Sequence, residues 1–252
     1  MEKEKIIEKV MQKREFSQLP KKDVEKALSH FERRDASDEE KARLSRELLH
    51  KVYGSFVSKK LLSLKNKDKE WILRKHLSTR ERLSYYKEVY ARIFKKVDSA
   101  TVIDLGAGIN GFSYAFFPIK INYIGVEAIG QLVDLANDYF KRNKIHGKMF
   151  HFSLFDIEKV KEIINAAKKP RIVFLFKTLD SLEMLERDYS KGLLNEIAPI
   201  VDQVVVSFAT RSMIARRPFM VKRNWIVRFI EENFKILDDF ELGGERYISF
   251  SK

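Results

Sequence analysis

Apolar residues in the first 96 positions recur at intervals of three and four, the spacing that places them on one face of an α-helix. One series is Val24, Ala27, Leu28 and Phe31, and similar series follow at residues 42–53 and 79–96. This part of the chain contains one proline and one glycine, so little interrupts the helices. The pattern predicts an all-helical domain over residues 1–96.

At residue 101 the pattern changes to short apolar runs that alternate with helical segments. We expect strands at residues 101–105, 122–126, 146–151, 171–176 and 204–208, and helices at 130–141, 157–167, 181–197 and 224–233. Two last runs, 234–242 and 247–251, flank two adjacent glycines and predict a hairpin. Residues 97–252 should therefore form a doubly wound, mostly parallel seven-stranded sheet with helices on both faces.

A candidate cofactor motif lies at the ends of the first two of these strands. The first apolar run contains Asp104 and is followed by Gly106 and Gly108, and the second run ends in Glu127. Carboxyl ends of neighbouring parallel strands meet at one edge, where such sheets bind nucleotide-like cofactors. Glycines let the backbone turn tightly and lie directly against a ligand. Glu127 can accept hydrogen bonds from both ribose hydroxyls.

Gly111 completes the Gly-x-Gly-x-x-Gly pattern of dinucleotide sites, so the glycines alone leave a nicotinamide or flavin cofactor open. They also fit an ordinary strand–turn–helix. Asp104 favours S-adenosylmethionine (SAM), because its carboxylate would repel a pyrophosphate and suits the cationic methionine end of SAM. The motif and the terminal hairpin together predict an α/β fold of the class I SAM-dependent methyltransferases.

The other strand ends supply the remaining cofactor contacts. We assign Ala107 and the two glycines to the methionine moiety, and Phe155 and Asp156 to the adenine, although Asp156 also suits the N-cap of the next helix. Phe176 ends the fourth strand, which lies beside the sulfonium in this architecture.

Methyl transfer is expected just beyond Phe176, where Lys177 and Asp180 are the candidate catalytic residues. Lys177 could orient the base or a phosphate; the alternative is a lysine that extends from a strand end to solvent. The Asp/Asn-Pro-Pro-aromatic signature of amino-group methyltransferases does not occur here.

The net charge of the chain indicates the kind of partner that it binds. The net charge is +13, and residues 1–100 carry 27 Lys and Arg against 17 Asp and Glu. A basic extension on a cofactor-binding domain favours a polyanionic substrate such as nucleic acid. A well-solvated helical surface is the alternative.

A second basic stretch, residues 203–230, contains no acid. Its loop should overhang the edge of the sheet that binds the methyl donor, and its cations could bind RNA phosphates. The alternative is a solvated loop with Trp225 buried in the core. The predicted RNA-binding residues are Arg211, Arg216, Arg217, Lys222 and Arg223.

The composition excludes several classes of protein. The chain has no cysteine, which excludes disulfides, zinc–thiolate sites and cysteine nucleophiles. The five histidines do not pair at metal-ligand spacing, so we expect no metal. No run of eighteen apolar residues occurs, so we expect a cytoplasmic monomer without a membrane span. Abundant Lys, Glu, Ile and Arg follow the trend of hyperthermophiles.

Three further segments stand out: residues 76–83 with tyrosines at 85, 86 and 90, residues 174–183, and residues 206–212. Together they resemble the aminoglycoside-resistance methyltransferases of small-subunit (16S) rRNA. With the glycine motif, the similarity covers about residues 70–250. It implies SAM as methyl donor and the small ribosomal subunit as substrate. It also implies an arginine facing the methionine carboxylate, for which we favour Arg82 over Arg80; pairing of either with Glu81 within its helix is the alternative.

Two departures from that family concern the target base. Asp180 and Ala209 stand where the family has proline. Guanine N7 carries its own lone pair and needs no base, whereas the delocalised amine of cytidine N4 would gain from an acceptor such as Asp180. We therefore expect cytidine N4 methylation by an archaeal relative of the family. Guanine N7 methylation is the alternative, followed by a non-catalytic ribosome-assembly factor or a small-molecule methyltransferase.

Overall fold

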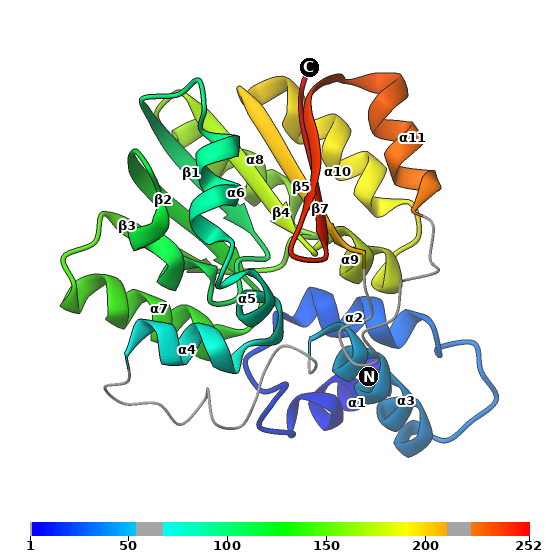
Figure 1. Ribbon diagram of the computed structural model, residues 1–252. Coiled ribbons are helices and arrows are strands. Elements are labelled where there is room, and N and C mark those ends of the chain that lie inside the picture. Colours follow the sequence, from blue (N-terminus) through cyan, green and yellow to red (C-terminus); the bar gives the residue numbers. More distant parts are fainter. Residues whose placement is uncertain (1, 54–67, 211–222) are drawn as a thin grey trace.

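The computed structural model of the chain describes residues 2–53, 68–210 and 223–252 (Figure 1). Six helices precede the first strand within these ranges. They are α1 (Glu2–Met11), α2 (Lys21–Ser29), α3 (Asp38–Val52), α4 (Lys69–Lys75), α5 (Leu77–Arg82) and α6 (Tyr86–Ile93). The predicted helical character of the N-terminal part is thus borne out over the described residues.

Seven strands form one mixed sheet in the order β3-β2-β1-β4-β5-β7-β6. The strands are β1 (Ser99–Leu105), β2 (Lys120–Glu127), β3 (Gly147–His151), β4 (Arg171–Phe176), β5 (Gln203–Ala209), β6 (Lys235–Leu242) and β7 (Glu245–Ser251). The first five pair in parallel, whereas β7 pairs antiparallel with both β5 and β6. The predicted doubly wound sheet with an antiparallel edge is confirmed, because buried apolar runs specify parallel strands.

Helices cover both faces of the sheet. The connecting helices are η3 (Asn110–Phe116, a 3₁₀ helix), α7 (Gly130–Arg142), α8 (Ile157–Ala166), α9 (Leu179–Leu185), α10 (Tyr189–Ile197), η4 (Ala198–Ile200, a 3₁₀ helix) and α11 (Asn224–Asn233). Figure 1 shows α6 in front of the sheet and α8 and α10 behind it. The helix α6 packs on η3, while α10 contacts α8 and α11.

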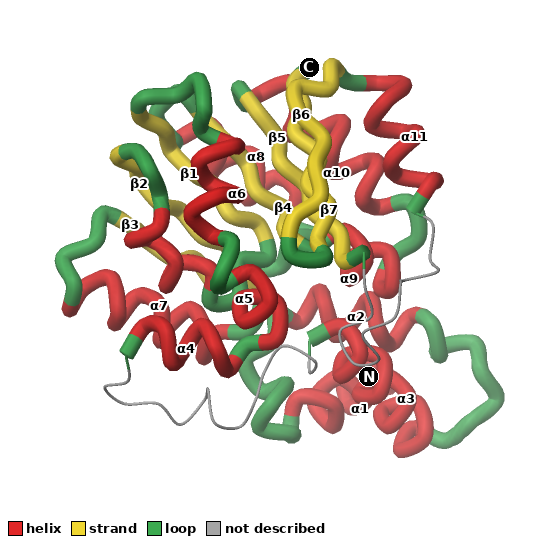
Figure 2. The backbone as a smooth tube through the Cα atoms, viewed as in Figure 1, coloured by secondary structure: helices red, strands yellow, loops and turns green. Residues whose placement is uncertain are grey.

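The helices α1, α2 and α3 pack on one another and form what we call the N-terminal bundle. Figure 2 shows the bundle below the sheet, next to α9, and both α2 and α3 contact α9. Its buried residues, including Val10 and Leu49, belong to the same hydrophobic cluster as the sheet. The bundle therefore lies at the carboxyl ends of the parallel strands.

Local sequence explains where several helices begin and end. Ser37 caps α3 by accepting from the Glu40 amide at 3.3 Å, as the spacing of the two residues predicts. Two segments that we expected to be continuous helices are each divided, at residues 83–85 and 186–188. At the second break, Asp188 takes a left-handed conformation, and Glu183 accepts from the amides of Asp188 and Ser190. The Glu183 side chain thus accepts hydrogen bonds from backbone amides that would have no partner at the start of α10.

Candidate functional site

A cavity of about 90 Å³ opens where β1, β2 and β4 end and the N-terminal bundle begins. Its wall combines the glycine motif, several buried charged residues and apolar side chains. From the sheet domain it includes Asp104, Gly106, Ala107, Gly108, Asn110, Glu127, Ala128, Ile129, Leu132, Leu154, Phe176, Lys177, Thr178, Ser181 and Leu182. From the helices before the sheet it includes Asp23, Val52, Tyr53, His76, Ser78, Thr79 and Arg82.

The glycine motif requires glycine for two physical reasons. Gly106 and Gly108 have φ angles of +76° and +52°, in the left-handed region. A Cβ at Gly106 would stand 2.7 Å from Oγ1 of Thr178, which itself donates to the Leu105 carbonyl at 3.0 Å. The turn therefore exposes its backbone to the cavity, as a cofactor-binding loop must.

Hydrogen bonds from two side chains hold one carboxylate oxygen of Asp104. Its Oδ2 accepts from Asn110 Nδ2 and from the Tyr123 hydroxyl, both at 2.7 Å. Burial raises the pKa of this carboxyl, and the two hydrogen bonds oppose that rise. Because Asp104 also lines the cavity, a fixed carboxylate faces the space beside the glycine turn.

Glu127 is oriented by backbone amides. Its two oxygens accept from Gly108 N at 2.8 Å and Ile129 N at 2.9 Å. Burial raises its pKa, and these amides lower it. Each oxygen keeps a second lone pair, so the carboxylate can accept the two hydroxyls of a ribose.

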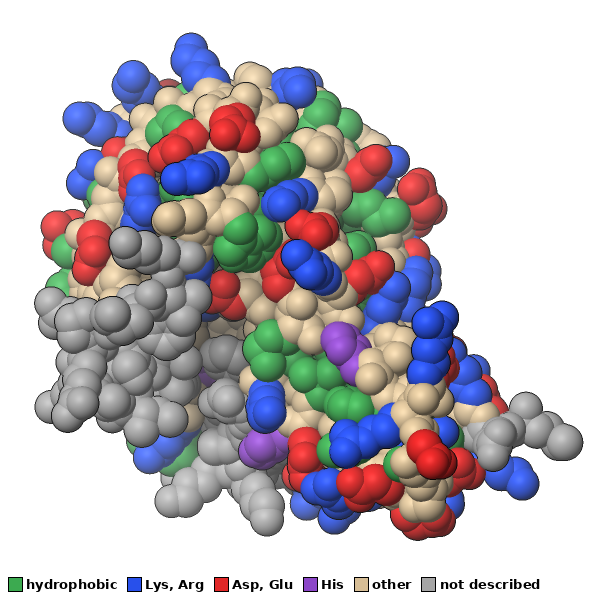
Figure 3. Space-filling model, turned by 90° about the vertical axis from the view of Figure 1, so that its right-hand side faces the viewer, with side chains coloured by type: hydrophobic (Ala, Val, Ile, Leu, Met, Phe, Trp, Pro, Cys, Tyr) green, Lys and Arg blue, Asp and Glu red, His purple; other side chains and the backbone are tan. Residues whose placement is uncertain are grey.

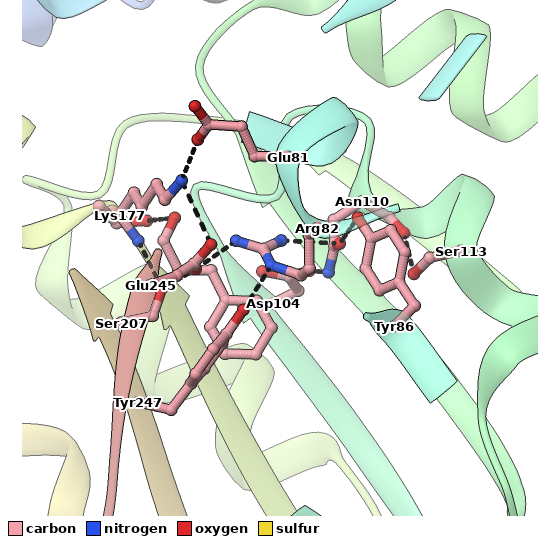
Figure 4. Close-up of polar contacts among 12 residues, drawn as sticks. Glu81, Arg82, Tyr86, Asp104, Asn110, Ser113, Lys177, Ser207, Glu245 and Tyr247 are labelled. Atoms are coloured by element: carbon pink, nitrogen blue, oxygen red, sulfur yellow. Dashed lines mark hydrogen bonds and ion pairs between the residues drawn. The ribbon is translucent and has the colours of Figure 1, made fainter. Parts of the chain in front are cut away.

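Arg82, Lys177, Glu81 and Glu245 form a buried ion cluster beside the cavity (Figure 4). Arg82 Nη2 pairs with Glu245 at 2.6 Å, and its guanidinium lies 4.6 Å from the centre of the Phe176 ring. Arg82 also donates to Tyr247 and Asn110, at 3.1 and 3.3 Å. Its orientation is therefore fixed by three side chains.

Lys177 does not extend into solvent. Its Nζ lies 2.8 Å from Glu81 and 3.2 Å from Glu245, and its side chain is 7% exposed. Its backbone has a φ of +58°, an uncommon and costly conformation for lysine. Burial acts to raise the pKa of Glu245, but the charges of Arg82 and Lys177 outweigh it and lower that pKa.

His76 lies beside the glycine turn, where a Cβ at Gly108 would stand 3.2 Å from its Nε2. Burial, followed by the charges of Arg82 and Lys177, lowers the pKa of His76 to about 3. The imidazole is therefore neutral at physiological pH.

The structure does not bring Asp180 into the cavity wall. Its carboxylate pairs with Arg223, with Nε at 2.8 Å and Nη2 at 2.7 Å from Oδ2. Arg223 also donates to the Ala209 carbonyl at 2.8 Å. The predicted acceptor and one predicted RNA-binding residue thus bind each other.

Phe155 and Asp156 also lie outside the cavity wall, which instead takes Leu154 from the same loop. The Phe155 ring packs on Tyr189, with centroids 4.6 Å apart, and Asp156 pairs with Lys159 at 3.0 Å. Asp156 stands at the N-cap position of α8, without a side-chain capping bond. The adenine contacts that we assigned to these two residues are not supported by their positions.

Asp23, Tyr53 and Glu245 were missed by sequence reasoning. Asp23 and Tyr53 belong to helical patterns remote from the glycine motif, and Glu245 follows the glycines of the hairpin. No local motif marks them, because only tertiary packing brings them to the site.

The expected RNA-binding surface is only partly described. Arg211, Arg216, Arg217 and Lys222 lie outside the described residues. On the face in Figure 3, Lys and Arg side chains alternate with Asp and Glu. In the bundle, Lys3 and Lys21 pair with Glu32 and Glu4. Carboxylates of the bundle therefore neutralise part of the N-terminal positive charge.

No helix in the described ranges is both long and apolar enough to cross a membrane. Within the same ranges, no group of three or more His, Asp or Glu residues could hold a metal ion.

Residues 67–233 match the protein family described as ribosomal RNA methyltransferase (FmrO). Among curated proteins, a 16S rRNA (guanine(1405)-N(7))-methyltransferase of Frankia casuarinae is 30% identical over 154 residues, which are 56% of this chain and 48% of that protein. A protein of the same name from Proteus mirabilis is 24% identical over 190 residues, covering 72% of this chain and 64% of the relative. The match thus spans about half to two thirds of these relatives.

Solved structures of 16S rRNA methylases share the fold over nearly the whole chain. The structure of RmtF in complex with S-adenosyl-L-homocysteine aligns with a TM-score of 0.82 at 20% identity, covering 99% of this chain and 98% of that one. An rRNA methylase from Escherichia coli aligns with a TM-score of 0.79 at 20% identity, covering 99% of each chain. The predicted class I SAM-dependent methyltransferase fold is confirmed.

Proposed function

Because the chain belongs to the ribosomal RNA methyltransferase (FmrO) family, we propose that it transfers a methyl group from SAM to guanine N7 in 16S rRNA. The substrate would be the small ribosomal subunit, in the cytoplasm. The observation that carries the proposal is the cavity at the carboxyl ends of β1 and β2, with a glycine turn between two oriented carboxylates.

The cavity offers a group for each part of the methyl donor. Asp104 faces the ammonium of the methionine moiety, and Glu127 accepts from the ribose hydroxyls. Arg82 uses three of its five N–H donors on described side chains, which leaves two that can bind the methionine carboxylate. When bound, SAM supplies an electrophilic methyl group on a sulfonium.

The residues at the end of β4 favour guanine N7 over cytidine N4. The N7 lone pair can form a bond to the methyl carbon, as the carbon–sulfur bond breaks, without giving up a proton. Cytidine N4 must lose a proton, but the carboxylate that we expected to assist, Asp180, is bound by Arg223 outside the cavity wall. Both curated relatives are named as guanine N7 enzymes. The expectation of cytidine N4 methylation, based on Asp180, is therefore withdrawn.

Lys177 and Arg82 then have positioning roles. Both carry positive charge at the place where the donor and the base meet, and both are fixed through Glu245. Fixed cations beside the reacting atoms can orient the base or its phosphate without reorganisation.

The test is to incubate unmodified small subunits with the protein and labelled SAM, and to identify the methylated nucleoside by mass spectrometry. We expect 7-methylguanosine. Methylated cytidine would overturn the choice of base, and binding of S-adenosylhomocysteine without methyl incorporation would indicate a non-catalytic factor. Glu127→Ala should lose donor binding and incorporation, whereas Glu158→Ala, an exposed change on α8, should keep both.

A further inference from the structure

A carboxylate of the N-terminal bundle is buried in the wall of the cofactor cavity. Asp23 stands in the first turn of α2 and is 2% exposed. Its Oδ1 accepts from the Tyr53 hydroxyl. Its Oδ2 is buried and meets no donor in hydrogen-bonding geometry among the described residues, although the Ser153 hydroxyl is near enough to stabilise the carboxylate. A buried carboxylate oxygen with unused acceptor capacity is costly, so a donor on a bound ligand would stabilise it.

The bundle is fastened on both sides of this cavity. On one side, Gln131 at the start of α7 donates to the Arg14 carbonyl at 3.3 Å. On the other side, Lys26 pairs with Glu186 at 2.5 Å, and a ring nitrogen of His30 lies 2.9 Å from the Leu185 carbonyl. Asp23 is therefore held at the cavity by contacts on either side of it.

The surroundings of Asp23 favour a neutral donor. Burial raises its pKa, and the hydroxyls of Ser153 and Tyr53 and the charge of His151 oppose that rise. No lysine or arginine is among these influences. The oxygen Oδ2 thus suits an uncharged N–H group rather than a cation.

The position of Asp23 identifies which part of the methyl donor it meets. Ser153 lies just past β3, next to Leu154 in the cavity wall, and the carboxyl end of the third strand is where we expected the adenine. Glu127, one strand away, is positioned for the ribose. We propose that Asp23 accepts a hydrogen bond from the 6-amino group of the donor's adenine. This inference rests on the proposed function and replaces the role that we first gave to Asp156.

The test compares two ligands by isothermal titration with the full chain. One is S-adenosylhomocysteine, and the other is S-inosylhomocysteine, whose 6-oxo group cannot donate. Wild type should bind the adenosine compound about 10- to 100-fold more tightly, the range for a hydrogen bond to a charged group. Asp23→Ala should bind both compounds almost equally, because the acceptor that distinguishes them is gone.

The ratio of the two affinities separates recognition from a structural role. A variant that only loosens the cavity would weaken both ligands and keep the ratio. If Asp23→Ala does not fold, the isosteric Asp23→Asn variant is titrated in its place. Its side-chain amide can accept from a 6-amino group or donate to a 6-oxo group, so the preference for the adenosine compound should disappear. Glu25→Gln removes a carboxylate from the same helix away from the cavity and should leave the ratio unchanged.

Two outcomes would overturn different statements. An unchanged preference for adenosine in the folded Asp23 variants would refute the role of Asp23 and leave the methyl-donor site intact. Failure of the wild-type protein to bind S-adenosylhomocysteine would refute the proposed function itself.

Discussion

Three buried carboxyl groups, those of Asp23, Asp104 and Glu127, line the proposed donor site. Burial raises the pKa of each, because the low-polarity surroundings disfavour a negative charge. Hydrogen bonds from neutral groups keep the carboxylates usable as acceptors. The negative charge of each of these three carboxylates is thus less stable here than it would be in water.

The raised pKa of Glu127 predicts a pH dependence with opposite signs for stability and binding. A carboxyl with a raised folded-state pKa contributes stability below its ordinary value of 4.5, and this contribution is lost as pH rises through the folded pKa. Ribose binding needs the ionised acceptor, so affinity for S-adenosylhomocysteine should instead fall on acidification, beginning above pH 4.5. His76 remains neutral throughout this window.

Comparison with Glu127→Gln isolates this effect from other titrating groups. The free energy of unfolding of wild type, relative to the variant, should decrease as pH rises, and calorimetry of binding should show a shallower pH profile for the variant. Affinity that stays constant down to pH 4 would contradict the raised pKa.

Single residues were predictable where the motif is local. Gly106, Gly108, Glu127 and Phe176 stand at the cavity because each follows or ends a strand that the apolar pattern reveals. Asp23 carries no such signal, because only the packing of α2 at the end of the sheet gives it a role.

At the scale of elements, one arginine connects the helix and the strand end that hold the two departures from the family pattern. Arg223, just before α11, binds Asp180 on α9 and the Ala209 carbonyl at the end of β5. The resemblance predicts proline at both of those positions. Here Arg223 acts as a charged clamp that joins α9 to the end of β5 instead.

The clamp should be measurable as a coupling between residues. A double-mutant cycle of Asp180→Ala and Arg223→Ala, measured by urea unfolding, should give a coupling energy of about 0.5–2 kcal/mol. This value is expected because Arg223 is nearly buried and binds the carboxylate in a fork geometry. The exposed pair of Asp188 and Lys191 serves as the matched control and should give about 0.5 kcal/mol or less. Equal coupling in the two pairs would contradict the clamp.

Element types were predictable because short apolar runs differ from the three- and four-residue spacing of a buried helix face, but the breaks within helices were not predictable. The sequence from 181 to 197 favours helix throughout, yet Glu183 caps a new helix from within the old one. A helix break set by one capping side chain and one left-handed residue leaves little trace in the hydrophobic pattern.

At the scale of the whole molecule, the charge excess of +13 predicts how the protein meets its substrate. Binding to small subunits should weaken as salt rises, with log K falling against log salt by roughly 0.7 to 0.9 per phosphate contacted. Filter binding in a salt series measures the slope, and binding of S-adenosylhomocysteine in the same buffers should change little. A slope near zero would refute phosphate-driven docking.

The overall fold followed from the sequence, but the relation between its parts did not. We expected the first 96 residues to form a basic helical domain that docks on rRNA, and that role stays a prediction. The structure adds that α2 and α3 supply part of the cavity wall, and that α6 packs along the sheet through η3. Which surfaces meet depends on side-chain fit between distant segments, which periodicity does not encode.

Glu245 follows Arg82 and Lys177 along the chain, so it leaves the ribosome last during translation. Until β7 has paired with β5, the two cations have only Glu81 as a carboxylate partner within the buried ion cluster. Enclosing two cations with one anion is costly, and this opposes closure of the nascent site. Pairing of β7 with β5 therefore completes the charge balance of the ion cluster, and we expect the wall of the proposed donor site to close only once this segment has emerged from the exit tunnel.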